Sequence, residues 1–165
     1  LKTRRSVRAY KADPVPEELL DQVLEAGTYA PSAMGRQSPT LIAVTSPKYR
    51  EQISKLNAAV MGTDKDPYYG APVIVQALAD PAIGPWVEDA SCALENMMLA
   101  AHALGLSTVW VHREREIFDS EAGKALLRKW GLPETLRGVG SIALGYGAAP
   151  APQPKPRKES YILKV

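Results

Sequence analysis

Apolar and polar positions along this chain recur at spacings that distinguish helices from strands. A first helix is predicted to begin at Pro16, because proline suits a first helical turn and Glu17 and Glu18 lie near the positive end of the helix dipole. Leucine and valine then recur at helical spacing over residues 19–24, and Pro31 lies just past the predicted end of the helix.

A helix is also predicted over residues 47–60, with Ile53, Leu56 and Val60 on its packed face, and another over residues 120–130. Short apolar runs predict four strands, the first of which is expected to be buried: residues 40–45, 72–79, 107–112 and 138–146. Strands interleaved with helices in this way predict an α/β (α+β) fold of three layers, in which helices cover both faces of a sheet.

The stretch over residues 85–104 is apolar nearly all round. A helix without a polar face has to be buried, so this one is predicted to be the central helix of the chain, half of a subunit interface, or both. Asp89 is expected to cap it, and Glu95 is expected to need a partner. His102 and Cys92, on the same helix, are interpreted as packed structural residues.

Composition restricts the classes of protein to which the chain can belong. Its 165 residues suit one domain, and no apolar run approaches the ~20 residues of a membrane helix. The single cysteine excludes an internal disulfide, and two histidines argue against a dedicated metal site. A net charge of +2 is too small to indicate nucleic-acid binding. We therefore expect a cytoplasmic protein without a metal, membrane or nucleic-acid partner.

Positive charge is concentrated at the two ends of the chain. The basic residues there are Lys2, Arg4, Arg5, Arg8 and Lys11 at one end and Lys155, Arg157 and Lys158 at the other. In Arg4-Arg5-Ser6-Val7-Arg8, guanidinium groups and a hydroxyl can surround the oxygens of one phosphate, with a two-point geometry that lysine lacks. Taken alone, the same motif is more simply interpreted as a basic surface strand.

Two familiar nucleotide-binding patterns do not fit. The chain has no G-x-x-x-x-G-K-[ST] loop, which excludes a P-loop. Gly138-Val-Gly140 lies within a predicted strand and does not open a helix, so a dinucleotide-binding Rossmann fold is disfavoured.

Several segments, taken in order along the chain, resemble motifs of the nitroreductase family of FMN flavoproteins. The opening R-R-S-x-R-x-F/Y of that family is similar to residues 4–10 (RRSVRAY), and its A-P-S-x-x-N-x-Q loop is similar to residues 29–37 (YAPSAMGRQ). Its strand entry, central dimer helix, next strand, closing A-L-G-Y and final K-x-R are similar to residues 69–75, 89–106, 108–112, 143–146 and 155–157.

The resemblance implies one FMN-binding domain over residues 1–147, with a mixed sheet around the central dimer helix, and an extended C-terminal arm over residues 148–165. Arg8 would lie toward the pyrimidine edge of the flavin ring, where a fixed cation favours the negative charge left by reduction. The FMN phosphate would be held from both ends of the chain, by Arg4, Arg5, Ser6, Lys155 and Arg157.

The remaining implied contacts come from two segments. A loop would reach the FMN of the other subunit of a homodimer through Pro31, Ser32, Ala33 and Met34. Gln37 would lie near the same face or the ribityl chain, and Gly35 replaces an asparagine that relatives carry. The end of a strand would run past the flavin ring at Trp110, Val111 and His112.

The implied activity is an FMN oxidoreductase that transfers hydride from NAD(P)H to small electrophilic acceptors such as nitroaromatics or quinones. Because the flavin carries the chemistry, no side chain is expected to be catalytic. Donor and acceptor would use one cavity in turn, which gives ping-pong kinetics. Two alternatives stay open: a specialised flavin enzyme of the same family (a dehalogenase, an enone reductase or a flavin-destroying enzyme), and a cofactor-free dimeric module that binds anions.

Overall fold

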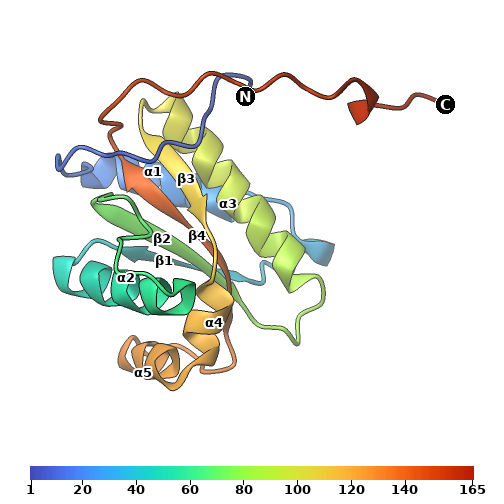
Figure 1. Ribbon diagram of the computed structural model, residues 1–165. Helices are drawn as coiled ribbons and strands as arrows, with labels where there is room; N and C mark the ends of the chain where they lie inside the picture. Colours follow the sequence, from blue (N-terminus) through green and yellow to red (C-terminus); the bar gives the residue numbers. More distant parts are fainter.

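The computed structural model describes residues 1–165 (Figure 1). Its helices are α1 (Glu17–Thr28), α2 (Pro47–Met61), α3 (Trp86–Ala103), α4 (Glu114–Asp119) and α5 (Glu121–Lys129). Its strands are β1 (Pro39–Val44), β2 (Val73–Ala79), β3 (Ser107–Val111) and β4 (Arg137–Gly145). Single 3-10 turns occur at η1 (Ala33–Gly35) and η2 (Glu159–Tyr161). Every helix and strand predicted from the sequence is present, and α4 is a helix that the pattern did not predict.

The four strands form one sheet in the order β1-β2-β4-β3. All three pairs of named strands are antiparallel, and a bridge between Ser6 and Thr108 of β3 adds the parallel part of the expected mixed sheet. The connection after β1 explains this direction. Helix α2 leads the chain away from the end of β1, and residues 62–72 bring it back, so that Ile74 near the start of β2 pairs with Val44.

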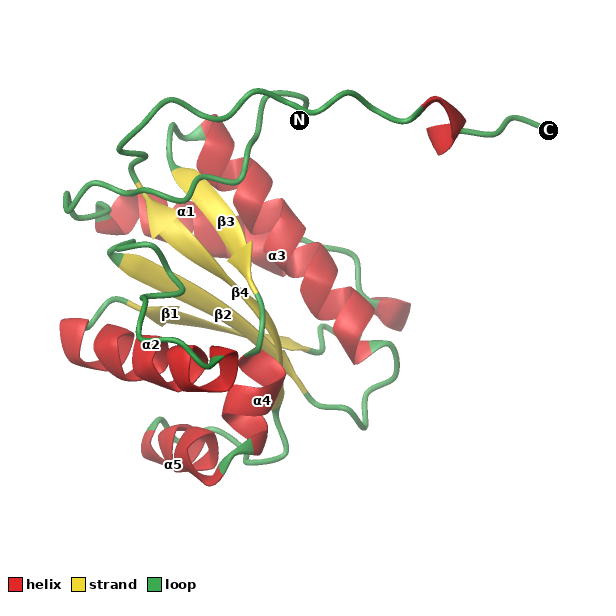
Figure 2. Cartoon of the chain, in the orientation of Figure 1, coloured by secondary structure: helices red, strands yellow, loops and turns green.

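Helices cover both faces of the sheet, which confirms the predicted three layers (Figure 2). The fully buried strand β2 shows how one strand serves two cores. Val73, Val75 and alanines 77 and 79 pack with α1 and α3, whereas Ile74 and Leu78 pack with residues of α2, α4 and α5. This alternation follows from the two-residue period of a strand, and it makes the sheet the middle layer.

Two details of the predicted packing are wrong. Strand β1 is an edge strand of the sheet, so its residues are half-buried except for Val44. In α2, Val60 is 43% exposed because it belongs to the last turn, beyond the edge of the core. The packed face of that helix is instead formed by Ile53 and Ala58, together with the buried polar residues Ser54 and Asn57.

Helix α3 buries one face and exposes the other in this chain. Alanines, Leu94 and methionines 97 and 98 pack against the sheet and α1, while a stripe formed by Glu88, Cys92, Glu95 and Ala103 is exposed. Within the single chain this face of the helix is open, and neither Cys92 nor Glu95 is buried. Asp89 is not the cap either, because Pro85 occupies that position and Asp89 lies in the first turn.

Residues 148–165 are exposed throughout and extend away from the layered body, toward the C-terminus marked in Figure 1. The apolar residues near this end are correspondingly open, with Leu163 85% exposed. None of the helices is both long and apolar enough to span a lipid bilayer.

Candidate functional site

The N-terminal segment is fixed along β3, an edge strand of the sheet. Ser6 bridges to Thr108, and the Val7 amide donates a hydrogen bond to the Thr108 carbonyl at 3.1 Å. Val7 is buried, whereas Ser6 is half-buried and Arg8 is exposed, as the alternation of an extended segment requires. Further along, Tyr10 bridges to residue 147 after β4. The basic motif is therefore held beside β3 from its first residues.

A hollow of about 250 Å³ lies at the start of β3, between the N-terminal segment and the end of α3. Arg4 lines it, and the Nη1 atom of its guanidinium is buried without a hydrogen-bond partner. Buried polar groups in folded proteins nearly always have partners, and a buried charged donor without one is costly. The orphaned nitrogen therefore makes this hollow a candidate anion site.

The other residues around this hollow have partners within the chain. Arg5 also lines it, but its Nη1 atom donates to the carbonyls of Lys2 and Arg4 at 2.7 and 2.8 Å. His102, at the end of α3, pairs through Nε2 with the Thr3 hydroxyl at 2.8 Å, so this histidine has a partner within the chain. Of the predicted phosphate residues at this end, Arg4 is thus the one with a buried donor left over.

The two basic residues of the C-terminal arm are separate from this group. Lys155 and Arg157 are exposed, and the Arg157 guanidinium donates to the Lys155 carbonyl at 2.8 Å. Neither residue forms a hydrogen bond or ion pair with the N-terminal segment; from the arm, only Ala151 lines the hollow beside Arg4. The structure of the single chain therefore does not bring together the two basic ends.

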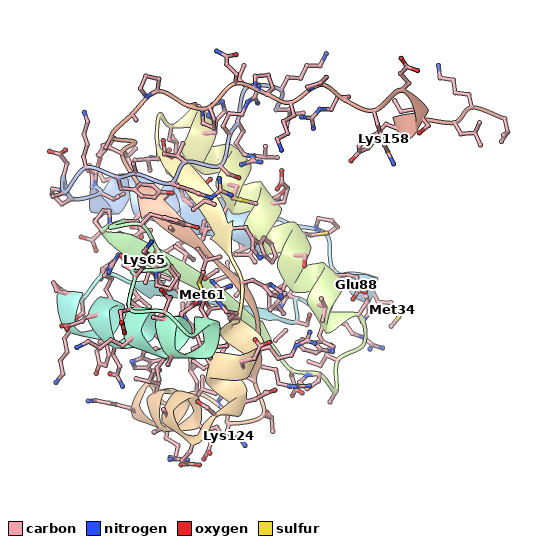
Figure 3. All side chains as sticks on the ribbon, viewed as in Figure 1. Met34, Met61, Lys65, Glu88, Lys124 and Lys158 are labelled. Atoms are coloured by element: carbon pink, nitrogen blue, oxygen red, sulfur yellow. The ribbon has the colours of Figure 1, made fainter.

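The loop over residues 31–37 lies at the opposite end of α3 and is tied to it by Asp89. The buried Asp89 carboxylate accepts hydrogen bonds from the Ala33 amide at 3.0 Å and from the Ser38 hydroxyl at 2.9 Å. The sequence analysis did not find this role, because it assigned Asp89 to the cap of the helix. Met34, at the tip of the loop, is 79% exposed, and Figure 3 labels it close to Glu88 of α3.

The backbone of this loop is bent by three residues in the left-handed region, one of which is Gly35 with φ 65°. Met34 has φ 53° and Gln37 has φ 50°, and the Gln37 amide donates to the Ser32 hydroxyl at 3.0 Å. Pro31, Ser32 and Gln37 line a cavity of about 390 Å³ whose apolar wall comes from α1, β1 and α3. The loop is thus fixed in shape, with its tip turned outward.

The distance between this loop and the Arg4 hollow is set by α3. Asp89 holds the loop in the first turn of the helix, and His102 lines the hollow at the last turn. At ~1.5 Å per residue these two residues are about 20 Å apart along the helix axis. One chain therefore presents the two predicted groups of FMN contacts at opposite ends of one rigid element.

The third predicted group, Trp110, Val111 and His112, lies at the far end of β3. Trp110 is half-buried, Val111 is buried and His112 is exposed. All three line a cavity of about 380 Å³ that is also bounded by the segment between α2 and β2. Gly140 of β4 makes room for Trp110, because a Cβ atom at that position would clash with the indole ring. The strand glycines thus serve packing, in agreement with the rejection of a glycine fingerprint.

Beneath this cavity is a buried polar cluster that the sequence analysis missed. Glu114, the first residue of α4, is fully buried and accepts hydrogen bonds from the Tyr68 hydroxyl at 2.7 Å, Gln76 Nε2 at 2.6 Å and the Ser141 hydroxyl at 2.6 Å. Burial raises the pKa of the Glu114 carboxyl, although these hydrogen bonds oppose the rise. A signal was available: Gln76 interrupts an apolar strand, and a buried amide needs polar partners.

Asn57 connects this cluster to the turn after β3. Its Nδ2 atom donates to the Tyr68 hydroxyl at 3.0 Å and to the His112 carbonyl at 2.9 Å. Its Oδ1 atom accepts from Arg113 Nε at 2.7 Å. Arg113 itself has φ 83°, a left-handed conformation that favours glycine. The turn at residues 112–113 is therefore held by the Asn57 side chain of α2.

Comparison with known proteins identifies the family. The model of the Nitroreductase family matches residues 1–146. Two curated relatives provisionally named NADH dehydrogenase/NAD(P)H nitroreductase are similar over most of the chain: one from Methanothermobacter thermautotrophicus (34% identity, 90% of this chain and 75% of the relative) and one from Archaeoglobus fulgidus (35% identity, 87% and 81%). A solved nitroreductase with bound FMN from Bacteroides fragilis superposes with a TM-score of 0.89 at 33% identity, over 99% of this chain and 95% of the other. The chain belongs to the nitroreductase family.

Proposed function

We propose that this chain binds FMN along β3 and uses it as an NAD(P)H-dependent oxidoreductase acting on small electrophilic acceptors such as nitroaromatics and quinones. The observation that carries the proposal is the buried, unpartnered Nη1 atom of Arg4 in the hollow at the start of β3. A phosphate would supply the missing acceptor, with a charge-assisted bond. The bound FMN of the Bacteroides fragilis relative and the NAD(P)H in the names of two curated relatives support the same assignment.

The length of β3 suits this orientation of the cofactor. The Arg4 hollow lies at the start of the strand and the cavity of Trp110, Val111 and His112 at its end. At ~3.3 Å per residue the two ends are about 13 Å apart, the reach of a ribityl phosphate joined to a three-ring flavin. We therefore assign the phosphate to Arg4 with Arg5 and Ser6, and the ring to the end of β3, with Arg8 beside the strand as a nearby cation.

A homodimer is the second part of the proposal. The loop of Pro31, Ser32, Ala33, Met34 and Gln37 would contact the FMN of the partner subunit, because about 20 Å of helix separates it from the Arg4 hollow of its own chain. Dimerisation would also cover the exposed stripe of α3. The arm would then fold onto the dimer and bring Lys155 and Arg157 to a phosphate. The free Cys92 suits a reducing cytoplasm, which we propose as the compartment.

When FMN is bound, its ring supplies the acceptor for a hydride and the donor of two electrons. The overall reaction would be NAD(P)H + H⁺ + acceptor giving NAD(P)⁺ and the two-electron-reduced acceptor; for a nitro group the products are a nitroso group and water. The residues of the chain would position the FMN ring and polarise it. Trp110, fixed against Gly140, would form an apolar wall, and the backbone of the turn held by Asn57 would face the ring. No side chain is needed as a nucleophile.

Flavin titration tests the cofactor assignment. Arg4→Ala should weaken FMN binding by about 1.5–3 kcal/mol, the contribution of a charge-assisted hydrogen bond, when measured by quenching of flavin fluorescence. Arg157→Ala should have a similar effect if the arm reaches the phosphate. Lys124→Ala, which removes a charge from α5 at the far end of the molecule (Figure 3), is the control and should not alter the affinity. Equal affinities for the wild type and the Arg4 variant would refute the phosphate site.

Steady-state kinetics test the shared cavity. Parallel lines in double-reciprocal plots of NAD(P)H against a quinone are expected, because donor and acceptor would bind in turn. Intersecting lines would contradict the binding of donor and acceptor in turn. Comparing turnover on a nitroaromatic, a quinone, an enone and a haloaromatic then separates a general nitroreductase activity from that of a specialised flavin enzyme. If the protein is colourless and takes up no FMN, the cofactor-free anion-binding module is the alternative that stands.

A further inference from the structure

The cavity at the end of β3 has an unbalanced charge. Met61 lines it from the last turn of α2 and Lys65 from the segment between α2 and β2, both labelled in Figure 3, and Arg113 lines it from the turn after β3. Neither Lys65 nor Arg113 forms an ion pair within the chain. Tyr69 and Trp110 add flat apolar surface to the same wall. The cavity thus combines two cations without counterions and aromatic side chains suited to a planar molecule.

The one carboxylate in the lining does not compensate for these cations. Asp66 forms an ion pair with Arg50 and accepts hydrogen bonds from the Ser54 hydroxyl and from the amides of Tyr68 and Gly70. Burial alone would raise the pKa of the Asp66 carboxyl, but these hydrogen bonds outweigh it and lower the pKa. Its oxygens are therefore already occupied, and its charge is offset by Arg50.

Arg113 is held so that its charged end is free. Asn57 Oδ1 accepts from its Nε atom at 2.7 Å, and no hydrogen bond of its two terminal nitrogens occurs within the chain. A guanidinium anchored through Nε presents two parallel N–H groups, the geometry that binds a carboxylate at two points. The φ of 83° is unfavourable for arginine, and a strained residue at a cavity is a reason to look for a function.

We propose that the acceptor reduced by this protein is a planar molecule that carries a carboxylate or another anionic group, and that Arg113, with Lys65, selects it. The inference rests on the proposed function and specifies the substrate class of that site. An acceptor has to lie against the flavin ring to be reduced, and we place that ring at the end of β3, so the anionic group of the acceptor would lie beside these cations.

Binding of unreactive ligands to the oxidised holoenzyme gives the first test. Benzoate and benzamide have nearly the same shape and differ in charge. The wild type should bind benzoate about tenfold more tightly than benzamide by calorimetry or flavin difference spectra, the ratio expected of a charge-assisted pair. In Arg113→Gly, which keeps a residue suited to the left-handed turn, the ratio should fall to about two or less. Lys55→Gln, which removes a lysine of α2 paired with Glu51, should keep the wild-type ratio.

The oxidative half-reaction gives the second test. Anaerobically reduced holoenzyme is mixed with p-nitrobenzoate or p-nitrobenzamide, and reoxidation is followed by absorbance. Two electrons and two protons leave the reduced holoenzyme, one N–O bond of the nitro group breaks, and its oxygen leaves as water. The ratio of second-order rate constants should favour the carboxylate by about tenfold in the wild type and approach one in Arg113→Gly.

The outcomes separate this inference from the proposed function. If the holoenzyme is reduced by NAD(P)H and reoxidised equally by both nitro compounds, the inference fails and the oxidoreductase stands. If Arg113→Gly alters only the rate of reduction by NAD(P)H and leaves both acceptor ratios intact, the charge serves the donor and the inference fails in the same way. A protein that takes up no FMN and is not reduced would overturn both.

Discussion

Replacing Glu114 tests whether the buried carboxylate organises the floor of the cavity. Glu114→Ala would leave the donors of Tyr68 and Gln76 without acceptors, whereas Ser141 still reaches the Val111 carbonyl at 3.3 Å. Two orphaned donors at about 1–3 kcal/mol each, with the lost side-chain volume, predict a destabilisation of about 3–5 kcal/mol. For a chain of this size that corresponds to a fall of roughly 6–20 °C in the melting temperature.

Glu114→Gln is the matched variant, and it should be far milder. Its oxygen can accept from Tyr68 and Ser141, and its new amide would face Gln76. The Oε1 atom of Gln76 is buried without a partner, so a flip of that amide would supply the acceptor that the new amide needs. Urea unfolding at neutral pH should therefore show a change within about 1 kcal/mol of the wild type.

The pH dependence of the free energy of unfolding is a more specific test of Glu114. Because burial raises the pKa of Glu114, the folded chain holds this proton more tightly than the unfolded chain, whose glutamate titrates near pH ~4.3. The stability contributed by protonated Glu114 is complete below that value and is lost as pH rises through the folded pKa. The Gln variant, which cannot ionise, should gain on the wild type by up to about 1.4 kcal/mol per pH unit in that window. A constant difference between the two proteins from about pH 4 to about pH 8 would refute the argument.

Two further substitutions test the supports of the site. Asp89→Ala should lower the free energy of unfolding by about 1–3 kcal/mol and speed proteolysis within residues 31–38, because the Ala33 amide and the Ser38 hydroxyl lose their acceptor. Glu88→Ala, on the exposed side of α3, is the control and should do neither. Equal cleavage of the two variants would contradict the role given to Asp89. Gly140→Ala should lower the free energy of unfolding by about 1–3 kcal/mol and alter the near-UV circular dichroism, because its Cβ would displace Trp110. At Gly84 a Cβ meets no atom within 4 Å, so Gly84→Ala is the control. A Gly140→Ala spectrum indistinguishable from that of the wild type would show that the indole is not confined.

The layers of the fold could be predicted from the sequence because their cause is local. The helical spacing in α1 specifies both the type of element and the face it buries, whereas the apolar run of β2 and the patterns of α2 and α5 specify the type of element. Helix α4 was missed because EREIFD resembles a charged loop, and only tertiary packing places Ile117 and Phe118 in the core. The direction of the individual strands was not predicted for a similar reason, since it depends on the long return segment between α2 and β2.

The candidate site was only partly predictable. Arg4 was assigned to a phosphate site from the family resemblance, and the structure buries its Nη1 atom without a partner, but the phosphate site itself stays a prediction. Glu114 could not be found from its neighbours in sequence, since an acid at the start of a helix is ordinarily a solvated residue. Its partners Tyr68 and Ser141 come from other elements, and only the folded chain brings them together.

The separation imposed by α3 has a consequence for how mutations would combine. If each FMN takes its phosphate contacts from one subunit and its loop contacts from the other, a defect at Arg4 and a defect in the loop of residues 31–37 belong to different sites when carried by different chains. A mixed dimer of two inactive variants would contain one site with both defects and one site with neither. Such pairs would complement each other, and the restored activity would come from a site that neither parent protein can form.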